Sequence, residues 1–245
     1  MFLYETHLHT SEASACARST GAEMAQACFN AGYTGIIVTD HFFYGNTCIN
    51  RDLPWQDWVT EFCRGYENAK KRGDELGLQV FFGWESCYHH IEFLVYGLDK
   101  EWLLSHPEIK DATLEEQFTI VTAMDGLVVH AHPFREEPYI PKIELYPTLV
   151  HGVETHNASH ASPLSTSHNI LDFDLRAQEY AKQHRLVQTG GSDVHKTIIL
   201  GGGTEFYSPL ADIHDFTRRI KTSDVKALHN GLQTDVPFLA AEKAE

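Results

Sequence analysis

The chain has 245 residues, of which 42% are hydrophobic and 22% charged, the make-up of an ordinary globular protein with a sizeable core. Its net charge of −15 disfavours stable nucleic-acid binding, because proteins that neutralise phosphates usually carry a basic face. The sequence shows no run of about 18 apolar residues and no signal-peptide pattern, so we expect no membrane association. Its 5 scattered cysteines form no CxxC pair, which excludes a zinc finger or disulfide framework and indicates free thiols in the cytoplasm.

Short apolar runs alternate along the chain with longer segments of helical period. Strands are predicted at residues 2–9, 35–41, 79–85, 92–97, 126–132, 151–157 and 185–193. Helices are predicted at residues 20–33, 55–77, 114–126, 173–184 and 213–221, with a short turn at 225–231. Thr20 with Glu23, and Thr113 with Glu116, have capping-box spacing, and Gly77 is expected to end the second helix.

Strands that alternate with helices predict parallel strands joined by helical crossovers. The runs GIIV at 35–38 and VFF at 80–82 are apolar on both faces, as parallel strands covered on both sides should be. The chain has no linker rich in Pro, Gly or Ser, no repeat and no low-complexity segment. We therefore predict an α/β protein with about seven βα units in one domain over residues 1–245, a barrel rather than an open sheet.

Polar residues stand at the ends of six predicted strands. His7 and His9 should share one face of the first strand, with Leu8 on the other, because side chains alternate along a strand. The later strands end in further polar residues, namely Asp40, His41, Glu85, His130, His132, Glu154, His156, Asp193 and His195. In a parallel barrel these ends lie on one rim, where loops build the active site.

Each of these residues alone is explained as well by an ordinary polar strand end or turn. Their repetition on six strands indicates a metal site instead. Imidazoles mixed with carboxylates suit zinc, iron or manganese. Because the set exceeds the three or four ligands that one ion needs, two or three divalent ions that share a bridging carboxylate are expected.

The motifs HLHT (7–10), TDHF (39–42), GWE (83–85), AHP (131–133) and GSDVH (191–195) together resemble the motif set of the PHP family, the polymerase and histidinol phosphatase family. They occur in the family's order and span most of the chain. The resemblance implies a distorted (β/α)7 TIM-like barrel with a trinuclear metal centre that hydrolyses phosphoesters.

By position in these motifs, the resemblance implies that His7, His9, Glu85 and Asp193 hold one ion. It implies that Glu85 bridges to a second ion bound by His132, and that His41 and His195 bind the third.

Two positions depart from the family pattern. Where many members have a further ligand after the first motif, this chain offers Glu12 as a carboxylate and Cys16 as a thiolate. Where many have a histidine before the fourth strand, it has Glu92, with His89 and His90 as alternatives.

The expected reaction is hydrolysis of a phosphoester by attack of a metal-bound water in the form of a bridging hydroxide. Asp40 is predicted to orient His41 or that water, and His195 is assigned a catalytic role beside its role as a ligand. Arg135 and then Arg18 are the predicted phosphate-binding side chains, since arginine forks onto phosphate oxygens. Lys196 is a weaker candidate.

His156 is a candidate either for facing the substrate or for supporting the ligands, and an ordinary structural role is slightly favoured over both. The substrate class is expected to be a small phosphorylated metabolite or nucleotide, because the surface is acidic and no further domain is evident. The aromatic segment at 41–58 could form a lid that stacks on a ring, or could simply pack against outer helices.

Two alternatives from other classes remain. The same residues could serve a metal-dependent amidohydrolase acting on C–N bonds, although the carbamylated lysine common in those barrels has no counterpart at a predicted strand end. The barrel could also be a non-catalytic metal-binding module. The sequence gives no indication of the oligomeric state.

Overall fold

The computed structural model describes residues 1–232, so the last part of the predicted domain, 233–245, lies outside the described residues. The strands are β1 (Phe2–Leu8), β2 (Gly35–Val38), β3 (Gln79–Tyr88), β4 (Ile91–Tyr96), β5 (Leu127–His130), β6 (Gly152–Asn157), β7 (Val187–Gly191), β8 (Gly202–Phe206) and β9 (Ala227–Asn230). The helices are α1 (Gly21–Asn30), α2 (Trp55–Phe62), α3 (Arg64–Leu76), α4 (Lys100–Ser105), the 3-10 helix η1 (Pro107–Asp111), α5 (Leu114–Ala123), α6 (Ala158–Ala161), α7 (Asp172–His184) and α8 (Ile213–Lys221).

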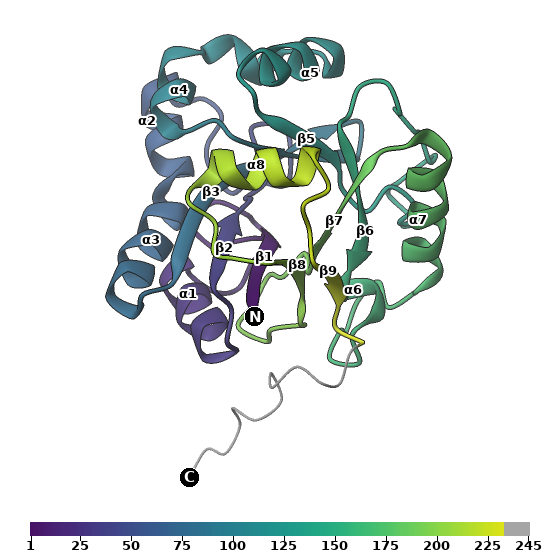
Figure 1. The fold of residues 1–245 in the computed structure, drawn as a ribbon. Helices are drawn as coiled ribbons and strands as arrows, with labels where there is room; N and C mark the ends of the chain where they lie inside the picture. The colour runs from purple at the N-terminus through teal and green to yellow at the C-terminus, as the bar shows by residue number, and fades with distance from the viewer. Residues whose placement is uncertain (233–245) are drawn as a thin grey trace.

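The strands form one mixed sheet in the order β7-β6-β5-β4-β3-β2-β1-β8-β9, with helices around it (Figure 1). The sheet curls so that β7, at one end of this order, comes back to β1 and nearly closes a barrel. The backbone N–H of His9 donates to Val194 O at 3.0 Å, and that of Val194 donates to His7 O at 3.2 Å, which ties β1 to the segment after β7. The predicted distorted TIM-like barrel is therefore confirmed.

The direction of one strand differs from the prediction. β4 runs antiparallel to both β3 and β5, so residues 92–97 are not part of a parallel βα unit. The cause is a two-residue turn, His89–His90, that reverses the chain directly, and it lets β3 continue past Glu85 to Tyr88. An apolar run shows that a strand forms but not which way it points.

Two further strands were not predicted. β8 begins with Gly202-Gly203, which has the composition of a loop, and β9 lies within residues 225–231, which were predicted as a turn. Both pair antiparallel, β8 with β1 and β9 with β8. β8 follows β7 with no helix between them, and antiparallel strands need no helical crossover, so the alternation of strands with helices does not reveal β8.

The helix termini follow the capping signals in the sequence. Thr20 with Glu23 and Thr113 with Glu116 form complete capping boxes at α1 and α5. Gly77 ends α3 with a left-handed φ of 77°. The helix predicted over 55–77 is instead two helices, α2 and α3, because the chain turns at Cys63.

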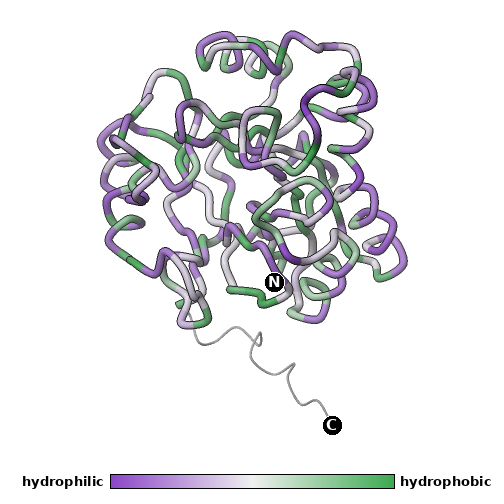
Figure 2. The backbone as a smooth tube through the Cα atoms, turned by 180° about the vertical axis from the view of Figure 1, so that it is seen from behind, coloured by the Kyte–Doolittle hydropathy of each residue, from purple (hydrophilic) through white to green (hydrophobic). Residues whose placement is uncertain are grey.

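Helices surround the barrel (Figure 1), and apolar side chains fill the layers between the two. α1 and α3 pack on β1 and β2 through a cluster that includes Met24, Ile36 and Ala69. On the outer helices, hydrophilic and hydrophobic residues alternate along the tube, as expected for helices with one buried face (Figure 2). Among residues 1–232, no helix combines the length and the apolarity needed to cross a bilayer.

α8 covers one end of the barrel. Its Phe216 packs edge-on against Tyr96 at the end of β4 and Phe206 at the end of β8, and all three are fully or almost fully buried. Tyr4, near the start of β1, belongs to the same cluster. This apolar plug leaves the opposite end, where β1, β2 and β7 finish, as the end that holds the polar residues.

Candidate metal centre

A β-bulge in β1 directs two histidines into the barrel. The register between β1 and β2 shifts between Glu5 and Leu8. Before the shift, Tyr4 belongs to the interior cluster, whereas after it Leu8 packs on the α1 side and His7 and His9 face the interior. The predicted alternation of His7, Leu8 and His9 is confirmed, and the bulge is the device that aims them.

Glu85 lies among three imidazoles. Its carboxylate oxygens lie 3.2 Å from His7 Nε2, 2.8 Å from His41 Nδ1 and 3.3 Å from His132 Nε2. Burial acts to raise the pKa of Glu85, but His7 and His41 outweigh it and hold this pKa well below its usual range. An ionised carboxylate in this position can bridge two cations.

Asp193 forms the opposite side of the cluster. Its Oδ1 lies 3.4 Å from His7 Nε2 and 3.2 Å from His9 Nε2, and the ring of His195 stacks on His9 with centroids 4.3 Å apart. Asp193 and His132 are both in the left-handed region, with φ of 55° and 27°. Such backbone strain in non-glycine residues persists where the surroundings enforce it, which is common at functional sites.

The cluster fits a divalent metal centre. Several buried polar atoms form no hydrogen bond despite their close neighbours, namely His7 Nε2, His9 Nε2, His41 Nδ1 and Glu85 Oε2. Unsatisfied buried groups are costly unless a ligand engages them. Four sets of side chains place their ligand atoms within 4.8 Å of one another: His7, His9 and Asp193; His7, Glu85 and His132; His41, Glu85 and Glu92; and His9, His41 and His195.

Glu154, on β6, holds His7 from behind. Its Oε1 lies 2.9 Å from His7 Nδ1, and its Oε2 accepts from the backbone N–H of His132 at 3.2 Å and from Asn157 Nδ2 at 2.9 Å. Burial acts to raise the pKa of Glu154, but His7 lowers it overall. In a neutral His7 this ionised carboxylate would fix the ring proton on Nδ1 and leave the lone pair of Nε2 available to a metal ion.

Asp40 lies beside the cluster and bonds the loop after β1, which differs from its predicted contact with His41. Its oxygens accept hydrogen bonds from the backbone N–H and the hydroxyl of Thr10, both at 2.6 Å, and from Ser14 Oγ at 2.7 Å. Ser14 Oγ in turn lies 3.2 Å from His9 Nδ1. Asp40 therefore anchors the loop after β1 and orients His9 through Ser14, and it makes no hydrogen bond to the ring of His41.

The prediction of Glu12 as a ligand is wrong. Its carboxylate accepts from the backbone N–H of Gly21, at the start of α1, and from Asn68 Nδ2, so it points away from the cluster. The thiol of Cys16 lies at the cluster instead. Burial acts to raise the pKa of Cys16, but hydrogen bonds from His195 and His41 lower it to about 6.

Glu92, the other departure from the family pattern, points into the cluster. Its oxygens lie 3.6 Å from His41 Nδ1 and 3.5 Å from His132 Nε2. Burial, together with the nearby Glu85, raises the pKa of Glu92 to about 8. His89 and His90, the alternatives to Glu92, form the β3–β4 turn and belong to none of the ligand sets.

Arg135 lies beside the cluster, 5% exposed, in a chain of buried polar groups. Its NH1 is 2.7 Å from Asp193 Oδ2, and its Nε donates to His160 Nε2 at 3.3 Å. His160 Nδ1 lies 2.8 Å from Asp174 Oδ1, which fixes the imidazole proton on Nδ1. Burial lowers the pKa of His160 to about 2, so the ring is neutral and accepts from the guanidinium.

Two strand-end histidines lie outside the centre. A register shift in β6 between Glu154 and His156 separates their faces, and His156 lines none of the cavities beside the centre, which corrects its predicted substrate contact. His130 stacks on Phe93 with centroids 4.8 Å apart. In the sequence, Glu154 stands out only as one of several polar residues at strand ends. No sequence motif marks Ser14, His160 or Asp174 as residues that support the site.

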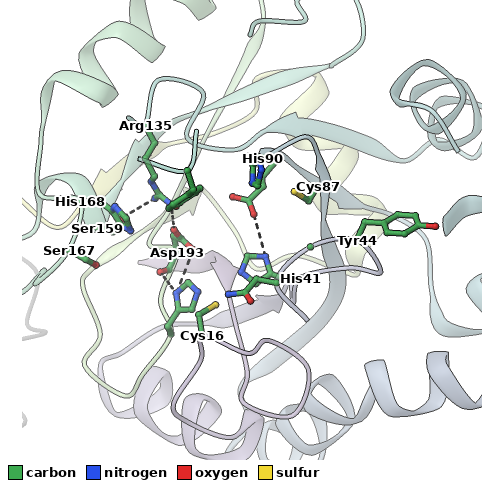
Figure 3. A pocket seen from close by; sticks show the side chains of 15 residues that line it. Cys16, His41, Tyr44, Cys87, His90, Arg135, Ser159, Ser167, His168 and Asp193 are labelled. Carbon is green, nitrogen blue, oxygen red and sulfur yellow. Dashed lines mark hydrogen bonds and ion pairs between the residues drawn. The ribbon is translucent and has the colours of Figure 1, made fainter. Parts of the chain in front are cut away.

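A cavity of about 490 Å³ opens over the cluster (Figure 3). Arg135, Asp193, His41 and Cys16 point into it, and its outer walls include the exposed rings of Tyr44 and Tyr139. The other aromatic residues at 41–58 mostly pack inward, as the buried Phe42, Phe43 and Trp58 show. Tyr44 is the aromatic residue of this segment that lines the cavity, and its hydroxyl donates to Asp111 Oδ1 at 2.8 Å.

Several solved structures are similar to this chain, whereas no protein-family model and no curated protein matches it. A two-domain protein from Bacteroides vulgatus that contains a predicted PHP-like metal-dependent phosphoesterase is 15% identical with a TM-score of 0.59; the match covers 80% of this chain and 53% of that one. A protein from Bifidobacterium adolescentis proposed to be a metal-dependent phosphoesterase is 15% identical with a TM-score of 0.56, over 91% and 96% of the two chains. The chain has a PHP-like fold.

An amidohydrolase from Chromobacterium violaceum, solved with bound sulfate and no metal, shares the PHP-like fold less closely. It is 14% identical with a TM-score of 0.50, over 79% of this chain and 87% of that one. The structural neighbours thus include two proteins predicted or proposed to be phosphoesterases and one described as an amidohydrolase. The match to this chain spans about half the length of the Bacteroides protein. At these identities the likeness concerns the fold, and the chemistry has to be argued from the site.

Proposed function

We propose that this protein is a metal-dependent phosphoesterase of the PHP family, which hydrolyses a small phosphorylated metabolite or nucleotide in the cytoplasm. The observation that supports this most is the convergence, at one end of the barrel, of His7, Glu85 and Asp193 with five more ligand side chains: His9, His41, Glu92, His132 and His195. Four of these side chains have a buried atom without a hydrogen-bond partner, namely His7 Nε2, His9 Nε2, His41 Nδ1 and Glu85 Oε2, which suits two or three zinc, iron or manganese ions.

The residues around the centre have separate tasks in this proposal. A divalent cation held here would lower the pKa of water and stabilise charge on the phosphoryl oxygens. His7 and His9 are held in their ligating orientation by Glu154 and by Ser14. Arg135, fixed by His160 and Asp193, presents its guanidinium at the cavity wall, where it binds a phosphoryl oxygen of the ester.

The outer part of the cavity favours a substrate with a flat or apolar portion. Tyr44 and Tyr139 are 57% and 54% exposed, and both line the cavity that leads to the centre. Exposed aromatic rings at the mouth of a cavity offer stacking surface for a base or another planar group. This arrangement supports a nucleotide or similar metabolite over a long polynucleotide.

The amidohydrolase alternative draws on the similarity to the Chromobacterium protein. A carbamylated lysine, common in metal-dependent amidohydrolases, would need a lysine at the centre. None of the residues that line the main cavity is a lysine, and each ligand set consists of His, Glu and Asp alone. The site therefore favours phosphoester hydrolysis.

The test is a substrate panel with metal analysis. Purified protein reconstituted with manganese, iron or zinc should bind more than one equivalent of metal and hydrolyse phosphoesters in preference to amides and lactones. His9→Ala and Asp193→Asn should each lose activity and at least one equivalent of metal, whereas Glu12→Gln should keep its metal. Full turnover in either variant, or a preference for amides, would contradict the proposal, and metal binding without any hydrolysis would indicate a non-catalytic module.

A further inference from the structure

A second cavity, of about 300 Å³, adjoins the one over the metal centre. The two are continuous, because six residues line both: Cys16, Ser159, Ser167, His168, Asp193 and His195. A molecule with one end at the centre therefore has room to extend into the second cavity. The proposed function assigns no part of the substrate to this second cavity.

Three loops that are bonded to one another build the second cavity. The backbone N–H of Arg18, in the loop after β1, donates to His195 O at 2.7 Å, and Thr197 N–H donates to Ser19 Oγ at 3.2 Å. Lys196 Nζ lies 3.5 Å from Thr166 Oγ1 on the loop after α6. These contacts fix the backbone of Arg18 beside the centre and place the ammonium group of Lys196 near the loop after α6.

The charges in the second cavity are unbalanced. Arg18 and Lys196 both line it, and neither forms an ion pair with a carboxylate among residues 1–232. Of the described residues that line this cavity, Asp193 alone is acidic, and its carboxylate is already engaged by Arg135. Two unpaired cations beside a catalytic centre are notable in a chain whose net charge is −15.

The remaining wall suits a short link between two charged groups. Leu164, Ile198 and Leu200 supply apolar surface, while Thr166 and Ser167 supply hydroxyl groups. A hydrocarbon or sugar segment can lie on the apolar side while an anion at its far end reaches the two cations. Arginine and lysine bind phosphate and carboxylate oxygens through charge-assisted hydrogen bonds.

We propose that this second cavity binds a second anionic group of the substrate, a phosphate or a carboxylate, through Arg18 and Lys196. The inference rests on the proposed function for the end of the substrate that lies at the metal centre. It narrows the substrate class to phosphorylated metabolites with two anionic groups on one short skeleton. Arg18 and Lys196 then determine specificity, whereas Arg135 serves the phosphate that reacts.

The test uses non-hydrolysable probes and manganese-loaded full-length protein, with binding measured by calorimetry. The probes are alkane bisphosphonates with three to six methylene groups, the matching phosphonocarboxylates, and alkylphosphonates of equal length. The best two-anion probe should bind at least about tenfold more tightly than its alkylphosphonate, which corresponds to about 1.4 kcal/mol. Whether the bisphosphonate or the phosphonocarboxylate binds better identifies the second anion.

The double variant Arg18→Gln/Lys196→Gln should remove most of this preference. The control Arg64→Gln/Lys70→Gln removes the same charge from exposed positions on α3 and should keep it. An equal affinity for one-anion and two-anion probes in the unaltered protein, a preference that survives in the double variant, or no binding of any phosphonate would overturn the inference. Because the assay measures binding, a lack of phosphoester turnover would count against the proposed function and leave the subsite to be judged on affinity.

Discussion

The two ring nitrogens of His7 have different partners. Nδ1 lies 2.9 Å from a carboxylate oxygen of Glu154, while Nε2 faces Glu85 and Asp193 without a hydrogen bond. A buried carboxylate behind a ligating imidazole sets its tautomer and raises its basicity. Glu154 is thus the residue through which β6 contributes to the centre.

Replacing Glu154 with Gln should weaken metal binding by about 10- to 100-fold, because the amide keeps the shape but removes the charge behind His7. Calorimetric titration with zinc or manganese measures the change. Glu12→Gln is the matched control, since Glu12 bonds Gly21 and Asn68 instead of the cluster, and its affinity should equal that of the unaltered protein. An affinity of Glu154→Gln equal to the control would show that the carboxylate has no role in ligation.

Cys16 places a thiol beside the histidines and carboxylates of the cluster. Its sulfur is hydrogen-bonded by His41 and His195, and the pKa of about 6 makes it a thiolate at neutral pH. Thiolates favour zinc over manganese.

Cobalt substitution should report whether this sulfur ligates. The Co²⁺-loaded protein is expected to show an intense thiolate-to-cobalt charge-transfer band, which disappears in Cys16→Ser and persists in Cys48→Ser. Cys48 is exposed and lies close only to the carbonyls of Ser11 and Glu12, so it is a suitable control. A cobalt spectrum unchanged by Cys16→Ser would place the thiol outside the coordination sphere.

The sequence predicted the residues of the cluster better than the residues that hold the cluster side chains in place. His7, His9, Glu85 and Asp193 stand at strand ends, where a shared rim makes convergence predictable. Ser14 and Asp174 support the site through contacts between segments distant in sequence, and no local pattern encodes such contacts. The prediction of Glu12 as a ligand failed because the carboxylate that follows the first motif most closely in sequence does not lie near the cluster in the fold.

At the scale of elements, the β3–β4 hairpin is the main departure from a regular barrel. Its turn consists of His89 and His90, with φ of 51° and 72°. Two consecutive left-handed residues form the type of turn that suits the twist of a hairpin, usually with Asn-Gly. Histidines there cost about 1 kcal/mol each or more, and His90 also lines the cavity over the centre.

The double substitution His89→Asn/His90→Gly should therefore stabilise the protein by about 1–2 kcal/mol while removing a side chain from the cavity wall. Urea denaturation gives the stability. Arg185→Gly, at a left-handed position (φ 57°) after α7, should stabilise the fold without touching the site, and it serves as the control. A loss of stability in the hairpin variant would mean that His89 or His90 makes contacts worth more than the backbone strain.

The sequence predicted the positions of the strands more reliably than whether each strand is parallel or antiparallel to its neighbours. β1 to β7 all lie within or next to predicted runs. Buried strands such as β2, β4 and β5 are largely apolar, which makes them easy to predict. Strand direction depends on the connection, and a two-residue turn of two histidines carries no familiar turn signal. The bulge between Glu5 and Leu8 is equally hidden, since it changes which face a residue occupies without changing composition.

For the whole molecule, the ligand sets join strands from both ends of the chain. His7 belongs to β1, Glu85 to β3, and Asp193 follows β7. A cation held by all of them binds the folded state alone, so its binding energy adds to the stability of the entire barrel.

Removing metal with a chelator should lower the melting temperature, and manganese or zinc at about 100 times its Kd should raise it by roughly 5 °C or more. Differential scanning calorimetry measures both. Asp193→Asn should show a clearly smaller increase, because it loses a ligand of the cluster. Identical melting temperatures with and without metal would contradict the proposal that these residues bind cations in the folded protein.

Because the candidate ligands are spread along the chain, they become available one after another during synthesis. His7 and His9 leave the ribosome early, yet their partners Asp193 and His195 follow only after β7 has been synthesised. Until then the first two imidazoles lack the neighbours that define a complete site, and the strand that carries them lacks its closing partner. The complete set of candidate ligands is therefore assembled only after β7 has been synthesised and the barrel has closed.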